Sequence, residues 1–418
     1  MKSIFQKALV SFALISATAP LGLAQQACKT NSAGVRTTVD GLPCVNTIVT
    51  SLPFLRIVPD ARSGAMGDVG LAIAPDANTM HFNASKLAFA EKDMGLSATY
   101  TPWLRALGLN DVYLAYLSGY KNIDKRQTIG VSLRYFSLGR IDFTDDAGTG
   151  TGFDNPNELE LNVAYARKFS PNFSGALSLK YIYSRLAGVG QRVGANGPEI
   201  RPVNAVAADL SFTYRKAIKI SDQKANICIG SAITNIGPKV SYTGTSTDRA
   251  DFVPTNLGIG VALGVDLDEF NSITVAVDAN KLLVPTPKRL GDKDYDLVDG
   301  VPGYKRLSPI QGMITSFSDA PGGFSEEMKE INYSVGLEYW YDKQFAVRAG
   351  YYSEDVTKGN RQFLTAGLGL KYNIFGLNFS YLVPTSTVRN PLDNTLRFSL
   401  LFDLGAFREP DEGGKKKK

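Results

Sequence analysis

Residue types that could carry out chemistry are sparse in this 418-residue chain. Its one histidine, His81, would need a neighbouring nucleophile to act as a general base. A lone histidine among Pro, Gly, Asp and Asn is more often a hydrogen-bonded structural residue, so we predict that His81 is not catalytic.

Two further motifs predict neither a cofactor nor a firm metal site. The stretch Gly64–Gly70 (GAMGDVG) loosely resembles a phosphate-binding loop but lacks the Lys-Ser/Thr that follows one, so it favours a turn. Asp292, Asp294 and Asp296 match the first ligand positions of a calcium loop, but Leu297 stands where the turn glycine is needed. A weak surface calcium site remains an alternative.

The N-terminus indicates export. Lys2 and Lys7 precede an apolar run that ends in small residues, which is typical of a secretory signal peptide over residues 1–24, cleaved before Gln25. A signal-anchor helix is the alternative, but Pro20 breaks the run too early to span a membrane. Removing the two lysines lowers the formal net charge from +5 to +3, too little to predict a nucleic-acid partner.

Export also bears on the cysteines. Cys28 and Cys44 could close a short disulfide loop in an oxidising compartment, or remain two unpaired thiols. A lipid-bearing Cys28 is disfavoured because residues 25–27 lack the apolar side chains of a lipoprotein signal.

Alternation of apolar and polar residues predicts an all-β fold, a transmembrane antiparallel β-barrel. In residues 158–167 (ELELNVAYAR), aliphatic and aromatic side chains alternate with polar ones, and the chain holds 40 Gly, 19 Tyr and 22 Phe. We expect roughly fourteen strands, starting near Asp93, Asp111, Gln127, Glu158, Phe173, Val203, Ala225, Pro254, Asn271, Ile331, Gln344, Arg361, Gly376 and Asn394.

The lengths of the connections give the expected topology. Long and short connections alternate, which predicts short turns and both termini in the periplasm and long loops outside the cell. We therefore expect an N-terminal plug segment over residues 25–92, a barrel over 93–405 with a long surface loop at 283–330, and a periplasmic tail over 406–418. A soluble β-sandwich or β-propeller is the alternative.

Aromatic and charged residues refine the barrel prediction. We expect interfacial girdles from Tyr100, Trp103, Tyr120, Tyr183, Tyr341, Tyr352 and Tyr381. The opposite face carries charges of both signs, among them Arg134, Lys180, Asp209, Asp278, Glu338, Arg348 and Arg397. Glycines on that face at positions 258, 260, 336, 350 and 367 leave room for chain packed against the wall, so we expect an occupied lumen.

The long loop is unusually apolar for a water-facing connection. It holds Met313, Ile314, Phe317, Phe324 and Met328 around a reversal at Pro321. Exposed apolar clusters mark docking surfaces, so we predict that these six residues bind a partner. We expect Ser325 to cap a short helical turn there.

Three stretches resemble the PorV family of the type IX secretion system. These are residues 53–89 (PFLRIVPDARSGAMGDVGLAIAPDANTMHFNASKLAF), 281–287 (KLLVPTP) and 316–331 (SFSDAPGGFSEEMKEI). The first contains the expected plug residues Arg62, Met66, Asp76 and Asn83. The family usually has Asn-Pro-Ala-Lys where this chain has Asn-Ala-Ser-Lys from Asn83, which bears on local plug geometry.

This resemblance implies a non-enzymatic, FadL-like outer-membrane barrel with protein partners. It would bind cargo proteins by their type IX C-terminal signal domains at an SprA-type translocon barrel. It would then deliver them to a PorU-type sortase and attachment complex, while outer-membrane lipid surrounds the barrel. The alternative is a FadL-type channel for hydrophobic small molecules, which would need a continuous apolar path that this charged, glycine-rich lumen lacks.

Overall fold

The computed structural model describes most of the chain. The described residues are 29–30, 36–37, 47–104, 109–144, 149–187, 198–244, 250–288, 295–298, 300–386 and 393–407. The expected signal peptide, Cys28, Cys44 and the C-terminal tail beyond 407 lie outside these residues. No helix among the described residues is long and apolar enough to cross a membrane.

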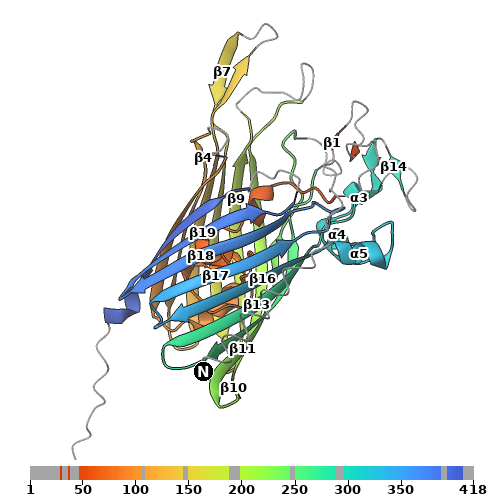
Figure 1. Ribbon diagram of the computed structural model, residues 1–418. Helices are drawn as coiled ribbons and strands as arrows, with labels where there is room; N and C mark the ends of the chain where they lie inside the picture. The colour runs from red at the N-terminus through yellow and green to blue at the C-terminus, as the bar shows by residue number, and fades with distance from the viewer. Residues whose placement is uncertain are drawn as a thin grey trace, which may run out of the picture.

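Fourteen antiparallel strands close into one barrel (Figure 1). The last strand pairs with the first through Phe398↔Tyr100 to Asp403↔Gly95. The strands are β3 (Met94–Pro102), β4 (Val112–Asn122), β5 (Gln127–Leu138), β8 (Asn157–Lys168), β9 (Phe173–Arg185), β10 (Val203–Ile220), β11 (Gln223–Ile236), β12 (Asn256–Asp266), β13 (Asn271–Leu282), β16 (Ile331–Tyr341), β17 (Phe345–Ser353), β18 (Gln362–Tyr372), β19 (Phe375–Pro384) and β20 (Leu396–Asp403).

The predicted fold class and strand number are confirmed. Each strand begins within two residues of the expected position, because every strand keeps one face on the lumen and the other outward. In β8 the polar Glu158, Glu160 and Asn162 are buried inside, whereas Leu161 and Val163 are exposed. At one end of the barrel six connections have only two to four residues, and β3 begins and β20 ends there.

Residues 51–90, called here the lumenal segment, pack against the inner wall. The segment contains η1 (Pro53–Arg56), α2 (Ala61–Gly64), η2 (Ala77–His81) and η3 (Ala84–Phe89). Short polar side chains start three of these turns: Asp60 accepts from Ser63 N, Asp76 from Asn78 N and Asn83 from Ser85 N.

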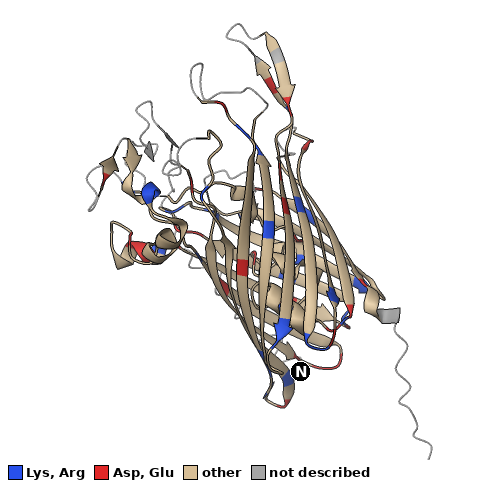
Figure 2. Ribbon diagram, turned by 180° about the vertical axis from the view of Figure 1, so that it is seen from behind, with Lys and Arg blue, Asp and Glu red and all other residues tan. Residues whose placement is uncertain are grey.

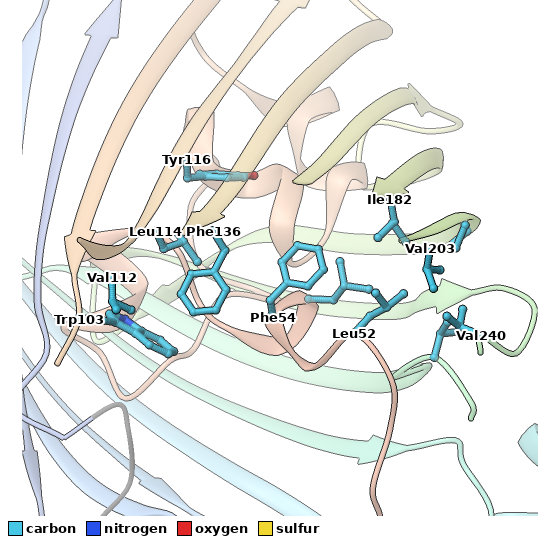
Figure 3. Packing of buried hydrophobic residues seen from close by; sticks show 14 of the residues in the cluster. Leu52, Phe54, Trp103, Val112, Leu114, Tyr116, Phe136, Ile182, Val203 and Val240 are labelled. Atoms are coloured by element: carbon cyan, nitrogen blue, oxygen red, sulfur yellow. The ribbon is translucent and has the colours of Figure 1, made fainter. Parts of the chain in front are cut away.

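Apolar side chains hold the first residues of the lumenal segment against the wall. Leu52 and Phe54 pack against Leu114, Phe136 and Ile182, which point inward from the wall (Figure 3). Such a buried cluster inside a barrel removes apolar surface from water on both the segment and the wall.

Wall glycines allow the backbone of the segment to come close. A Cβ on Gly350 would lie 2.0 Å from Gly67 N, and one on Gly336 would lie 2.6 Å from Met66 O. Gly67 itself has a φ of 69°, a conformation that favours glycine.

Three aromatic residues differ from the girdle prediction. Trp103, Tyr120 and Tyr352 are buried on the lumenal side, where Trp103 contacts Phe136 edge-on and Tyr352 stacks on Phe363. Alternate residues of a strand point to opposite faces, and these three occupy the inward-facing positions. Lying near a strand end does not turn such a side chain outward. Tyr100, Tyr341 and Tyr381 are exposed on the outer face.

Short elements outside the barrel were not predicted. Two small hairpins lie in the connections at the end with the long loops: β6 (Ile141–Thr144) with β7 (Gly150–Asp154), and β14 (Leu297–Val298) with β15 (Val301–Pro302). Elsewhere β1 (Lys29–Thr30) pairs with β2 (Arg36–Thr37), and η6 (Leu404–Phe407) follows the last strand.

Candidate functional site

The connection between β13 and β16, the surface loop (283–330), is folded and lies beside the barrel rim (Figure 1). After the β14–β15 hairpin come three helices, α3 (Gly303–Arg306), α4 (Pro309–Thr315) and α5 (Phe324–Lys329). A capping box starts α4: Gln311 N donates to Ser308 Oγ at 3.3 Å, and Ser308 N donates to Gln311 Oε1 at 3.1 Å.

The start of α5 differs from the prediction. Ser325 does not cap it, because the helix begins one residue earlier, at Phe324. Its N-cap is Gly323, whose φ of 69° suits glycine. Gly322 N donates to Glu326 Oε2 at 2.7 Å, so a carboxylate of the first turn binds a backbone amide of the preceding turn.

Five apolar side chains of the surface loop point to the outside. Ile310 and Ile314 are four residues apart on α4, and Phe324 and Met328 are four apart on α5, so each pair shares one side of its helix. With Phe317 between the helices they form what we call the apolar face. Phe324 is 80% exposed and Ile314 68%.

Of the residues predicted to bind a partner, Ile314, Phe317, Phe324 and Met328 belong to the apolar face, whereas Met313 and Pro321 are only half-buried beside it. Sequence reasoning missed Ile310, although its four-residue spacing from Ile314 is a helical signal.

The charged side of α5 is turned the other way and is buried. Glu326, Glu327 and Glu330 contact two lysines, Lys281 at the end of β13 and Lys358 in the connection after β17. Figure 2 shows acidic residues in red on the helical part of the surface loop beside the barrel. Lys281 Nζ lies 2.9 Å from Glu327 Oε2 and 2.6 Å from Glu330 Oε2. Lys358 Nζ lies 2.6 Å from Glu326 Oε1 and 2.9 Å from Glu330 Oε1. We call these five residues the clasp.

The clasp reverses the usual arrangement of an amphipathic helix. A surface helix ordinarily buries its apolar side and exposes its charges. Here the barrel supplies cations that neutralise the buried carboxylates, and the apolar side is left facing solvent or a partner. Sequence reasoning missed the clasp because its lysines come from distant strands and loops.

A fourth acid adjoins the clasp. Thr286 N donates to Asp319 Oδ2 at 3.0 Å. Burial raises the pKa of Asp319 to about 6, and the nearby Glu327 and Glu330 add to the increase. Burial would also raise the pKa of Glu326, but hydrogen bonds from Lys358 and Gly322 N outweigh it and leave that pKa below its ordinary value.

The predicted plug residues lie in the lumen and bind the wall. Arg62 donates to both carboxylate oxygens of Glu338 at 2.8 and 2.9 Å and to Asp76 Oδ2 at 3.1 Å. Arg348 donates to the same Glu338 at 2.7 Å. Asn83 donates to Thr213 Oγ1 on β10 at 3.0 Å, and to Leu71 O within the segment at 2.9 Å.

The remaining plug residue and its neighbours complete these contacts. Met66 is fully buried and packs near Gly336. Asp278 accepts from Gly70 N and Leu71 N at 2.7 and 2.9 Å, so a wall carboxylate binds the backbone of the segment. These contacts join the lumenal segment to β13, β16 and β17.

The other residues considered for chemistry have structural partners. Arg134 donates to His81 Nδ1 at 2.6 Å, and burial together with Arg134 lowers the pKa of His81, which keeps that nitrogen free to accept. Asp296 pairs with Arg306, while Asp292 and Asp294 lie outside the described residues. Within the described part of the chain, no three His, Cys, Asp or Glu side chains gather closely enough to hold a metal.

A closed fourteen-stranded antiparallel barrel with chain packed in its lumen defines an outer-membrane β-barrel protein. The family model for the type IX secretion system protein PorV matches residues 44–289. The chain belongs to the PorV family and is an outer-membrane component of type IX secretion.

Solved structures that resemble it include two toluene transporters and a FadL homologue. The Ralstonia pickettii toluene transporter TbuX is 12% identical, with 82% of this chain and 96% of that chain covered and a TM-score of 0.44. The Pseudomonas putida toluene transporter TodX is 12% identical, with 85% and 98% covered and a TM-score of 0.42. A Pseudomonas aeruginosa FadL homologue is 10% identical, with 86% and 100% covered and a TM-score of 0.39. No curated protein sequence matches the chain.

Proposed function

We propose that the apolar face of the surface loop docks a protein partner of the type IX machinery, and that the chain acts without catalysis of its own. The partner is an SprA-type translocon or the C-terminal signal domain of an arriving cargo. The chain then hands cargo to a PorU-type sortase and attachment complex. Both termini lie in the periplasm, and the surface loop lies outside the cell.

The observation that carries this proposal is the reversed amphipathicity of α5. Glu326, Glu327 and Glu330 are buried against the barrel while Phe324 and Met328 are exposed. A loop with no partner would gain by burying its aromatic side chains and hydrating its carboxylates. Full burial of Phe317 and Phe324 against a partner would contribute about 3–6 kcal/mol before ordering costs.

The lumen supports a docking role over the alternative of a channel for hydrophobic molecules. The cavity between the lumenal segment and the wall has a volume of about 110 Å³, and Arg56, Lys180 and Arg361 are among its lining residues. A passage for hydrophobic molecules needs a predominantly apolar lining.

The test is the double variant Phe317→Ala, Phe324→Ala. We expect it to assemble as a heat-modifiable barrel but to lose both the copurifying partner and the secreted cargo. Phe153→Ala is a matched control, because Phe153 is 58% exposed in the β6–β7 hairpin, away from the apolar face. Normal partner and cargo levels in the double variant would refute the proposal.

A further inference from the structure

The outer wall of β3, β4 and β5 contains an apolar hollow of about 590 Å³ that the docking proposal does not use. Leu96, Leu117, Ile129 and Val131 line it and are 42–53% exposed. Their neighbours along the strands, such as Ser118, are buried on the lumenal side, so the hollow faces away from the lumen.

The strand register explains why the wall is hollowed there. Gly119 lies opposite Leu96 on β3 and opposite Val131 on β5, so the middle of this cross-strand row has no side chain. Ala98, the next outward residue on β3 after Leu96, adds a second small side chain. Larger residues on each side therefore enclose a depression in a wall that is otherwise covered by aliphatic groups.

One end of the hollow carries a positive charge. Lys121 lies in the next row, opposite Met94 and Ile129, one residue before β4 ends at the short turn. Of the described residues that line the hollow, Lys121 is the one with a charged side chain. No ion pair joins it to another described residue. An apolar cleft of this kind suits the acyl chain of a phospholipid. A lysine at its end, level with the end of a strand, suits the anionic headgroup.

We propose that this hollow binds one glycerophospholipid, with an acyl chain over Gly119 and the phosphate on the Lys121 ammonium. The acyl chain replaces the missing side chains of the Gly119 row, and Lys121 gains the counter-ion that no described residue supplies. The leaflet, that of the periplasmic side, rests on the proposed orientation of the barrel, whereas the contacts themselves do not.

The experiment is native mass spectrometry of the full-length barrel in detergent, titrated with phosphatidylglycerol or with diacylglycerol carrying the same chains. Lys121→Gln should weaken phosphatidylglycerol binding about fivefold, since one surface cation is worth roughly that factor toward anionic lipid, and should leave diacylglycerol binding unchanged. Gly119→Leu should weaken both lipids, because the added side chain fills the hollow. Its Cβ would lie 2.6 Å from Leu96 Cδ2, a flexible side-chain end, and 3.1 Å from Gly95 O, so Leu96 must turn and β3 must shift by a few tenths of an ångström.

Two matched controls separate this site from general lipid contact. Lys216→Gln removes an exposed lysine on the outer face of β10, and Ala115→Leu adds bulk to β4 outside the hollow. Each should bind lipid as the unmodified chain does, with heat-modifiability reporting correct folding throughout. Equal lipid binding by the site variants and their controls would overturn the proposal. It would also be overturned if Gly119→Leu lost a copurifying protein while its lipid binding stayed normal, because the occupant would then be a protein.

Discussion

The carboxylate of Glu330 contacts both lysines of the clasp and a threonine hydroxyl of the surface loop. Its carboxylate contacts Lys281 Nζ at 2.6 Å and Lys358 Nζ at 2.9 Å, and it accepts from Thr286 Oγ1 at 2.7 Å. Buried carboxylates are stable only with such complete pairing. The apolar face is thus held outward by polar contacts, and weakening them should loosen α5 without disturbing the barrel.

Lys358→Met tests this coupling. It leaves Glu326 without its lysine and Glu330 with one lysine instead of two. Breaking a buried pair costs about 3 kcal/mol, roughly a hundredfold in a local equilibrium. We expect hydrogen exchange in residues 319–330 to accelerate strongly while the barrel remains heat-modifiable. Lys329→Met, an exposed change on the same helix, is the control, and equal exchange in the two variants would contradict the role of the clasp.

Asp319 makes the surface loop sensitive to pH. A carboxyl group whose pKa is raised in the folded loop stabilises the fold fully below its ordinary pKa, and this contribution is lost as pH rises through about 6. Glu326 has a lowered pKa, so its contribution to the stability of the loop is lost only when the pH falls below the ordinary range of a glutamate. After correction for intrinsic rates, residues 319–330 should exchange severalfold faster at pH 7 than at pH 5, an effect limited by the partial exposure of Asp319. Asp319→Asn should remove this difference, and a difference that persists would assign it to another group.

At the scale of elements, strands were predictable and the surface loop was not. Each strand borders two environments, so alternation such as Leu161, Asn162 and Val163 specifies it residue by residue. Helices α4 and α5, with seven and six residues, carry no such repeat. Their orientation depends on Lys281 and Lys358, which lie far from them in sequence and come together only in the closed barrel.

The fit between the lumenal segment and β17 gives a prediction at this scale. A methyl group on Gly350 would overlap the backbone of Met66 and Gly67, which cannot move as a side chain can. Gly350→Ala should displace the segment and raise single-channel conductance in planar bilayers. Gly376→Ala, where the nearest atom is Leu401 Cβ at 3.3 Å, should conduct as the unmodified barrel does. Unchanged conductance for Gly350→Ala would mean that the segment does not occlude the lumen.

The whole molecule has two dissimilar ends, and this asymmetry determines on which side of the membrane the apolar face and the Lys121 hollow should lie. The end with six short turns also holds the start of β3 and the end of β20. The opposite end carries the surface loop and the β6–β7 hairpin (Figure 1). Because outer-membrane barrels keep short turns in the periplasm, the apolar face should be available to partners at the cell surface and the Lys121 hollow should lie near the inner leaflet.

Cysteine labelling on intact cells decides this orientation. In a background without the native cysteines, Thr149→Cys and Ser318→Cys place thiols in two separate long connections, and Lys125→Cys places one in a short turn. All three positions are exposed, so reactivity should depend only on the side of the membrane. An impermeant maleimide should label the first two on whole cells and the third only after the outer membrane is opened. Labelling of Lys125→Cys on intact cells, with Ser318→Cys protected, would show that the barrel has the opposite orientation in the membrane. The surface loop would then face the periplasm, where it could not meet cargo emerging at the cell surface.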